Sequence, residues 1–355
     1  MKTSVDDEIL LSKDNSRSQC SSRNIKTCVH DGFPLPKYDD SWTDTDWLRF
    51  TAERMKRIDP PLQSKFRVYC VMTYGRNEAN DVLGFFSGTN SETPFIGSSL
   101  CAERSAAVQL RELKHGFEVK NIYLVSDLED EALTPGMLCR EYLAHCVGPT
   151  IRIHCASADL SKRNVTTLDT LLPHPSLYRG IPSDRIDTVV KAWKIDTDLK
   201  PEFRTLYDRA FEAATVAGRD DALHPVRYAG ALEFEDGSIV VDVQRKTLEY
   251  GSTVDALTAS LATFVNRKRV AGKAVRGVHV DQYGVLHAPF ATARAQLSER
   301  AGNWKMTFPV HRATRTSPKS TGISRLSITY ATLGELAPDY PKWRAEAGCA
   351  GHNHK

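Results

Sequence analysis

The sequence predicts an α/β protein made of two tandem domains that share one fold. The chain has 355 residues, 41% of them hydrophobic and 26% charged, which is enough for two domains that each bury a core. Patterns typical of amphipathic helices and of buried strands alternate along the first half, which favours a layered α/β sheet. The same order of patterns returns in the second half, which indicates an internal repeat.

The first half is predicted to fold as helix, hairpin, helix, strand, helix and strand. The predicted elements are a helix over 47–58, a hairpin over 66–88, a helix over 99–116, a strand over 121–127, a helix over 135–148 and a strand over 151–157. Pro60 and Pro61 end the first helix, because proline cannot continue a helical hydrogen-bond ladder. Gly116 lies just past the second helix, and Pro135 takes the first position of the third.

The second half repeats this order at a constant spacing. Its predicted elements are a helix over 201–218, a hairpin over 226–244, a helix over 253–269, a strand over 273–281 and a helix over 288–302. Three pairs of identical residues lie 154 positions apart: Ala102 and Ala256, Pro135 and Pro289, and Arg140 and Arg294. A fixed offset between like elements is the signature of a tandem duplication.

The domain boundaries follow from composition. Residues 1–45 are rich in Ser, Asp, Lys and Asn without a hydrophobic period, which predicts a disordered N-terminal tail. We expect a first domain over 46–180, a linker over 181–198, a second domain over 199–346 and a C-terminal tail over 347–355.

Charge and hydropathy exclude several classes of protein. The 47 Lys and Arg nearly balance the 44 Asp and Glu, so the chain lacks the basic character of a duplex-binding protein. No apolar run reaches the ~18–20 residues of a membrane helix, and the acidic N-terminus lacks the apolar stretch of a signal peptide. We expect a cytoplasmic protein, with nuclear entry left open. In such a chain, eight scattered cysteines point to metal binding or catalysis rather than to a disulfide framework.

Two helix starts carry residues suited to metal chemistry. Cys101, Ala102 and Glu103 begin one predicted helix, and Cys139 and Arg140 follow Pro135 at the start of the next. Free N–H groups and the helix dipole stabilise thiolates at helix N-termini. Two such thiolates can hold a zinc ion, with the carboxylate close to a bound water.

These residues resemble the cytidine deaminase family, whose pattern is C-A-E followed by P-C-x-x-C. Residues 66–68 are similar to the F-x-V opening of the family's first strand, and residues 171–174 to its L-L-P-H close. Residues 88–92 resemble its G-x-N-x-E ribose-binding segment, with Asn90 eleven residues ahead of Cys101. The likeness covers 46–180, and more weakly the second half, and it is to the free-nucleoside branch. It implies two tandem three-layer α/β/α domains, the second of them degenerate.

The resemblance also implies a reaction, the hydrolytic deamination of cytidine or deoxycytidine in pyrimidine salvage. Cys101 and Cys139 would be thiolate ligands of a zinc ion that lowers the pKa of water toward ~7. Glu103 would take a proton from that water, protonate N3 and then protonate the departing ammonia. Arg140 would offset the thiolate charge.

The family pattern assigns substrate-binding roles as well. Asn90 and Glu92 would hold the ribose 3′-hydroxyl, because reading a hydroxyl takes both a donor and an acceptor. Phe66 would pack against the base, and the Ala102 backbone would meet its polar edge. Simpler interpretations stay open for these residues: Glu103 as an acid that stabilises the helix dipole, Phe66 as an ordinary core residue, Asn90 and Glu92 as polar loop residues, and Arg140 as a solvated helix residue.

The motif departs from the family at Gly136, which stands where the first cysteine of P-C-x-x-C belongs. Two thiolates leave the usual three-ligand zinc site incomplete. Four alternatives follow: a third ligand from Cys70, a third ligand from the C-terminal Cys349, His352 and His354, a two-thiolate site completed by water, or no zinc. Cys146 lies two helical turns beyond Cys139 and is too distant to share its metal.

The second half has lost this machinery. Asp255 and Leu257 replace the ligand and the acid of C-A-E, and Gln244 and Lys246 replace the Asn and Glu of the ribose segment. A fold retained without its ligands predicts a supporting half, and the resemblance implies a homodimer that mimics a tetramer. We expect Tyr340 to contribute to the wall of a site.

Three functional classes are therefore compared. The first is the nucleoside deaminase. The second is a deaminase-fold pseudoenzyme that acts as an interaction or scaffold protein, which the missing cysteine at position 136 favours. The third is a nucleic-acid-editing deaminase, which the retained ribose segment and the lack of a basic, aromatic-interleaved stretch oppose.

Overall fold

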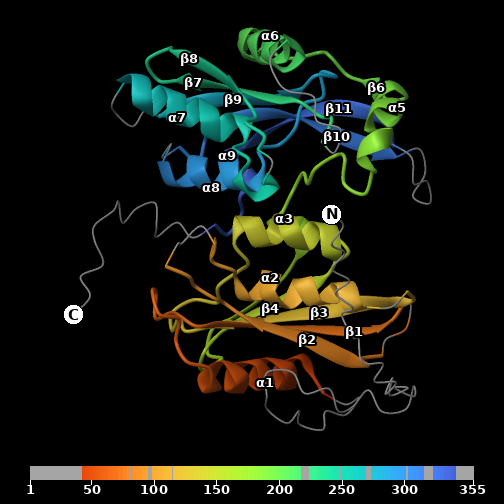
Figure 1. Cartoon of the computed structure of the whole chain (residues 1–355), viewed down its shortest axis with the longest axis vertical. Helices are drawn as coiled ribbons and strands as arrows, with labels where there is room; N and C mark the ends of the chain where they lie inside the picture. The colour runs from red at the N-terminus through yellow and green to blue at the C-terminus, as the bar shows by residue number, and fades with distance from the viewer. Residues whose placement is uncertain are drawn as a thin grey trace, which may run out of the picture.

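Two β-sheets with helices on both faces make up the computed structural model of the chain (Figure 1). The structure describes residues 42–77, 79, 81–94, 98–113, 115–216, 224–247, 249–268, 273–300, 303–315 and 323–340. The predicted C-terminal tail and all but the last four residues of the predicted N-terminal tail lie outside this part of the chain. Those four residues already belong to the fold, because Thr43 caps a helix that begins at Asp44.

The first half contains one five-stranded sheet. Its elements are α1 (Asp44–Arg57), β1 (Val68–Arg76), β2 (Gly84–Thr89), α2 (Ala102–Ala107), the 3-10 helix η3 (Val108–Glu112), β3 (Phe117–Ser126), α3 (Met137–Cys146), β4 (Arg152–Ser157), β5 (Arg163–Thr167) and α4 (Leu168–Leu171). The strand order is β2-β1-β3-β4-β5, with β3 and β4 parallel and the other neighbours antiparallel. The predicted helix over 99–116 is thus an α-helix of six residues that continues as a 3-10 helix.

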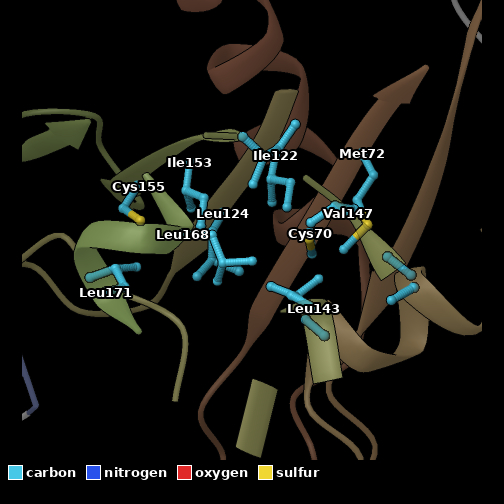
Figure 2. Close-up of a cluster of buried hydrophobic side chains, with 14 of the residues drawn as sticks. Cys70, Met72, Ile122, Leu124, Leu143, Val147, Ile153, Cys155, Leu168 and Leu171 are labelled. Atoms are coloured by element: carbon cyan, nitrogen blue, oxygen red, sulfur yellow. The ribbon is translucent and has the colours of Figure 1, made fainter. Parts of the chain in front are cut away.

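Alternation along β1 supplies both faces of this sheet with core residues. Tyr69 and Val71 point to the face covered by α1, where they join the aromatic cluster around Trp47. Cys70 and Met72 point to the face covered by α2 and α3. Figure 2 shows the second face, with Cys70 and Cys155 among its apolar side chains. The predicted three-layer arrangement therefore holds in the first half.

The second half contains a six-stranded sheet. Its elements are α6 (Pro201–Val216), β7 (Tyr228–Phe234), β8 (Ile239–Val243), the 3-10 helix η5 (Tyr250–Ser252), α7 (Ala256–Lys268), β9 (Ala274–Asp281), α8 (Ala291–Arg300), β10 (Thr307–Arg315), β11 (Ile323–Thr332) and α9 (Leu333–Leu336). The strand order is β6-β11-β10-β9-β7-β8. Helix α6 covers one face, and α7 and α8 cover the other.

The two sheets have the same topology. From its β8 edge the second sheet runs β8-β7-β9-β10-β11, the counterpart of β2-β1-β3-β4-β5. The pairing directions agree as well, with β9 and β10 parallel where β3 and β4 are parallel. The prediction of an α/β fold is confirmed, and the gene duplication behind the repeat stays a prediction.

The predicted linker is a structured segment. Residues 181–198 form the 3-10 helix η4 (Ser183–Arg185), α5 (Ile186–Lys191) and β6 (Lys194–Ile195). Strand β6 adds to the second sheet by pairing parallel with β11. Ile186 and Trp193 pack in a cluster with Tyr228 of β7, so this segment is built onto the second half.

Two buried arginines join the halves where α3 packs against α8 (Figure 1). Arg140 of α3 donates to the carbonyls of Pro135 at 2.6 Å and Leu171 at 2.8 Å in its own half. It also donates to the carbonyls of Pro338 at 2.6 Å and Asp339 at 3.4 Å in the other half.

Arg294 of α8 mirrors these contacts. It donates to the carbonyls of Pro289 at 2.7 Å and Leu336 at 2.6 Å in its own half. It also donates to the carbonyls of Pro173 at 3.1 Å and His174 at 2.9 Å in the first half. Each of the two arginines therefore donates to carbonyls of both halves, and together they hold the interface closed.

We expect Arg294→Met to destabilise the fold by about 3–5 kcal/mol, because it leaves four carbonyls at a buried interface without their donor. Urea unfolding followed by circular dichroism measures the change. Arg209→Met, on the exposed side of α6, is the control and should cost less than about 0.5 kcal/mol. A loss for Arg294→Met no larger than that of the control would contradict the structural role of this arginine.

Candidate metal centre and active site

Three of the predicted site residues meet where α2 and α3 begin. Cys101 is the N-cap residue of α2, Glu103 lies in its first turn, and Cys139 lies in the first turn of α3. One ligand atom from each lies within 4.8 Å of the others. Cys139 and Glu103 are buried, whereas Cys101 is partly exposed. Among the described residues, this is the one group in which three potential metal ligands lie close together.

Small residues bring α2 close enough to the sheet to build this cluster. A Cβ atom on Gly88 of β2 would lie 2.6 Å from the carbonyl oxygen of Ala102 and 2.4 Å from the backbone nitrogen of Ala106. Only glycine fits at this contact. Ala102 and Ala106 are themselves fully buried, so their short side chains allow the helix to lie against the strand.

The two cysteines share a proton. A hydrogen bond from the Cys139 thiol, together with the nearby Arg104, lowers the pKa of Cys101 to about 6. The same bond, together with burial, raises the pKa of Cys139. Without a metal the pair is therefore one thiolate and one thiol. Binding a divalent metal through both sulfurs would release the remaining proton.

Glu103 is tuned for proton transfer. Burial raises its pKa to about 7, and the negative charge of Cys101 adds to the effect. At pH 7 the carboxyl group is thus close to half protonated. A general acid–base residue works best when its pKa lies near the operating pH.

Arg104 is a cation beside the thiols. Its Nη2 lies 3.7 Å from the sulfur of Cys101 and also donates to the Ser99 carbonyl at 3.2 Å. The sequence analysis missed Arg104, although it directly follows the C-A-E motif. The donors of Arg140 go to four carbonyls and the Thr134 hydroxyl, and its charge interacts with Cys139, so its support of the thiolates stays a prediction.

The predicted ribose-binding pair lies at the end of β2, engaged with the chain before β1. Asn90 accepts from the Val68 N–H at 2.8 Å and donates to the Phe66 carbonyl at 2.8 Å. Glu92 accepts from the Ser64 N–H at 2.7 Å and from its hydroxyl group. Ser64 is a second residue that the sequence analysis missed, because nothing in the motif marks it.

Phe66 and Ala102 both belong to the face of the sheet that carries the site. Ala102 is fully buried, and the partly buried Phe66 packs against the same apolar cluster. The structure therefore gives Phe66 a core contact.

The donors fit a zinc ion. Thiolates are among its usual ligands, and Cys101 and Cys139 would supply two of the three protein ligands of a catalytic site, with the Glu103 carboxyl group beside them. Cys70 is not part of the group: it is fully buried in the apolar core, and burial raises its pKa. The cysteine and histidines of the predicted C-terminal tail lie outside the described residues.

Gly136 leaves room where a third thiolate could stand. It is the N-cap residue of α3, with φ −66° and ψ 163° that any residue can adopt. A Cβ atom built there meets no described atom within 4 Å beyond its chain neighbours. The predicted helix start at Pro135 is thereby corrected by two residues, to Met137.

Comparison with known proteins gives likenesses of low identity. No family model matches the chain. The cytidine deaminase from Mycobacterium tuberculosis is 23% identical, with a TM-score of 0.30 and an alignment over 41% of this chain and 97% of that one. The cytidine deaminase from Burkholderia pseudomallei is 20% identical, with a TM-score of 0.32 over 38% of this chain and 100% of that one. That from Bacillus anthracis is 15% identical, with a TM-score of 0.29 over 39% and 87%.

All three of these solved structures are cytidine deaminases. Because the TM-scores are near 0.3, the chemistry proposed below depends on the side chains of the site. In addition, none of the helices in the described ranges has the length and hydropathy to span a membrane.

We expect Gly136→Cys to raise the zinc affinity of the full chain at least about tenfold, because a third thiolate adds a coordination bond in the open space at this N-cap. Competition with a chromophoric chelator measures the affinity. Gly148→Cys is the matched control, since it adds a thiol at another position with open space, just beyond the C-terminal end of α3. Equal gains in both variants would contradict a site at Cys101 and Cys139.

Proposed function

We propose that the chain is a zinc-dependent hydrolase that converts cytidine or deoxycytidine to the corresponding uracil nucleoside and ammonia, as in pyrimidine salvage. The observation that carries this proposal is the meeting of two thiols with a buried carboxyl group. Cys101, Cys139 and Glu103 place their ligand atoms within 4.8 Å of one another, and the pKa of Glu103 is raised to about 7.

Cys101 and Cys139 would hold the zinc ion. When bound, zinc supplies a Lewis acid that lowers the pKa of water to about 7. Arg104 offsets the charge of the two thiolates from 3.7 Å. This arrangement keeps the negative charge of the sulfurs from accumulating beside the Glu103 carboxylate.

Glu103 would carry the protons of the reaction. As a carboxylate it takes a proton from the attacking water and passes it to N3 of the pyrimidine, while the water oxygen forms a bond to C4. It then transfers the second proton to the amino group, and the C4–N bond breaks to release ammonia. A pKa near 7 lets one residue act first as the base and then as the acid.

Substrate binding would fall to the end of β2 and the residues before β1. Asn90 and Glu92 offer one amide and one carboxylate to a sugar hydroxyl, in exchange for their present bonds with residues 64–68. Phe66 would supply a flat apolar surface to the base, and the backbone of Ala102 would meet its polar edge.

The second candidate is a deaminase-fold pseudoenzyme that binds partners without turning over substrate. Gly136 is the observation that favours it, because only two thiols are present where catalytic zinc sites use three protein ligands.

The second half would support the first. In this proposal residues 46–180 are the deaminase domain, and residues 199–346 are a degenerate copy fixed to it by Arg140 and Arg294. Tyr340 of the second half packs in one cluster with Met137, next to the start of α3, which supports the expected contribution to the site's surroundings.

We expect Glu103→Gln to lower turnover of cytidine by at least about 10²–10⁴-fold, because the amide cannot move a proton in either direction. Ammonia release by the zinc-loaded full chain measures turnover, and metal analysis confirms that the variant keeps its zinc. Glu129→Gln, an exposed residue on the loop after β3, is the control and should be as active as the wild type. Full activity in Glu103→Gln refutes the mechanism, whereas an inactive, zinc-loaded wild type selects the pseudoenzyme.

We also expect the chain to form a homodimer through the surface beside the metal centre. Leu138 lies between Gly136 and Cys139, and 49% of it is exposed, so it presents an apolar side chain at this surface. Light scattering at micromolar concentration should give twice the mass of one chain, and Leu138→Glu should reduce it to one. Val165→Glu, at an exposed position of β5, is the control and should stay dimeric. A wild-type mass of one chain excludes the dimer.

A further inference from the structure

A cavity of about 460 Å³ lies between the two halves, away from the metal centre. Pockets for drug-sized ligands and cofactors have ≈ 300–1,000 Å³. Its first wall comes from α3 and from residues 176–186, and its second wall comes from the second half. The residues used below that line it are Glu141, Tyr178, Arg179, His224, Tyr228, Gln244, Lys246, Asp255 and Phe290.

The cavity occupies, in the second half, the place of the metal centre in the first. Gln244 and Lys246 follow β8 as Asn90 and Glu92 follow β2. Asp255 precedes α7 as Cys101 precedes α2. An isolated bridge pairs residues 245 and 254, and another pairs residues 91 and 100, so the two segments have the same local structure.

The chemistry of the first half cannot take place in this cavity. Asp255 is used as a helix cap, since it accepts from the Thr258 N–H at 2.9 Å and from its hydroxyl at 2.6 Å. Leu257 stands in place of Glu103, and Ala293 in place of Cys139. The proton carrier and the sulfur ligands of the first half therefore have no counterparts at these positions. The space has been kept while the reactive groups have been lost, which favours binding without turnover.

Three aromatic side chains offer a flat surface to a ligand. Tyr228 meets Phe290 edge to face, with ring centroids 5.0 Å apart. Tyr178 donates its hydroxyl to Asp281, which also lies 2.9 Å from Nε2 of His287. These buried contacts hold the ring of Tyr178 in place before any ligand arrives. A rigid aromatic wall of this kind suits a planar heterocycle.

One acceptor in the cavity lacks a donor. The side-chain oxygen of Gln244 has no hydrogen-bond partner in the described part of the chain and is closed to solvent, so a ligand donor would bind it after the side chain turns toward the cavity. Its backbone N–H donates to the Tyr228 carbonyl at 2.9 Å, so the residue is fixed beside the aromatic wall. A buried acceptor without a donor costs about 1–3 kcal/mol, which a ligand N–H or hydroxyl group would recover.

The lining carries two cations and two acids, and the cations can hold an anionic group. Lys246 is cationic where Glu92 is anionic, and it donates to the carbonyl of His224 at the cavity. Arg179 adds a second cation. The acids are compensated by helix N–H groups, since Glu141 accepts from Ala291 at 2.8 Å and Asp255 caps α7. A phosphate group meets these requirements through charge-assisted hydrogen bonds.

We propose that this cavity is a second, non-catalytic site that binds a nucleoside monophosphate. The base would lie on the aromatic wall, a base N–H or sugar hydroxyl would donate to Gln244, and the phosphate would face Lys246 and Arg179. The choice of a nucleotide among planar anionic ligands rests on the proposed function, because the cavity is the counterpart of the proposed nucleoside site.

Isothermal titration of cytidine 5′-monophosphate into the zinc-loaded full chain tests this site. Gln244→Leu removes the unpaired acceptor, and Lys246→Glu reverses the charge; each should weaken binding at least about tenfold. Lys305→Glu, the same charge change at an exposed position outside the cavity, should leave affinity unchanged. Cytidine and inorganic phosphate, titrated separately, should each bind more weakly than the nucleotide.

Four results would overturn the proposal: no binding of the nucleotide, binding that both cavity variants leave intact, binding lost in Asn90→Ala instead, or phosphate alone binding equally well. If Gln244→Leu fails to fold, hydrogen exchange on the unmodified protein decides, since the nucleotide should slow exchange over 176–186 and around Gln244. Turnover of cytidine is measured apart from this, so that a lost deaminase activity with retained nucleotide binding refutes only the proposed function.

Discussion

The close contact between α2 and β2 at Gly88 is the constraint on which the metal centre depends. A side chain at this position would push α2 away from the sheet, and with it the N-cap that carries Cys101. The hydrogen bond that makes Cys101 a thiolate needs Cys139 of α3 at the same end of the sheet. The raised pKa of Glu103 follows from the same burial. Backbone packing therefore comes first, and the unusual acid–base properties of the site follow from it.

The two halves use one topology for opposite purposes. In the first, the starts of α2 and α3 expose sulfur and a carboxyl group to one another. In the second, the start of α7 is closed by its own Asp255 cap, and leucine and alanine fill the positions of the reactive groups. What survives is a space walled by aromatic rings and reached from both halves. The second half therefore lines a cavity but, among its described residues, lacks the cluster of two thiols and a carboxyl group found in the first.

Local chemistry was predictable from the sequence, and long-range contacts were not. Cys101, Glu103 and Cys139 could be found because helix starts and short spacings mark them. The contacts of Arg140 could not be predicted because its acceptors include carbonyls 31 and 198 residues away, which no motif reveals. Strand β6 has only two residues, too few for a period, so residues 181–198 resembled a linker. Strand β10 was missed because Pro309 interrupts the strand pattern of its sequence. In the structure Pro309 nevertheless lies in the strand, opposite Tyr330 of β11.

The reciprocal arginines have a consequence for how the molecule comes apart. If the halves separated, each guanidinium would lose its two acceptors in the other half and would need water in their place. Burial is the main cause that lowers the pKa of both to about 10, which shows how little water reaches them. The two halves therefore cannot separate without breaking the hydrogen bonds that each guanidinium makes to carbonyls of the other half. The cooperative unit is the pair of halves, and the thermal transition of the folded chain is expected to be a single one.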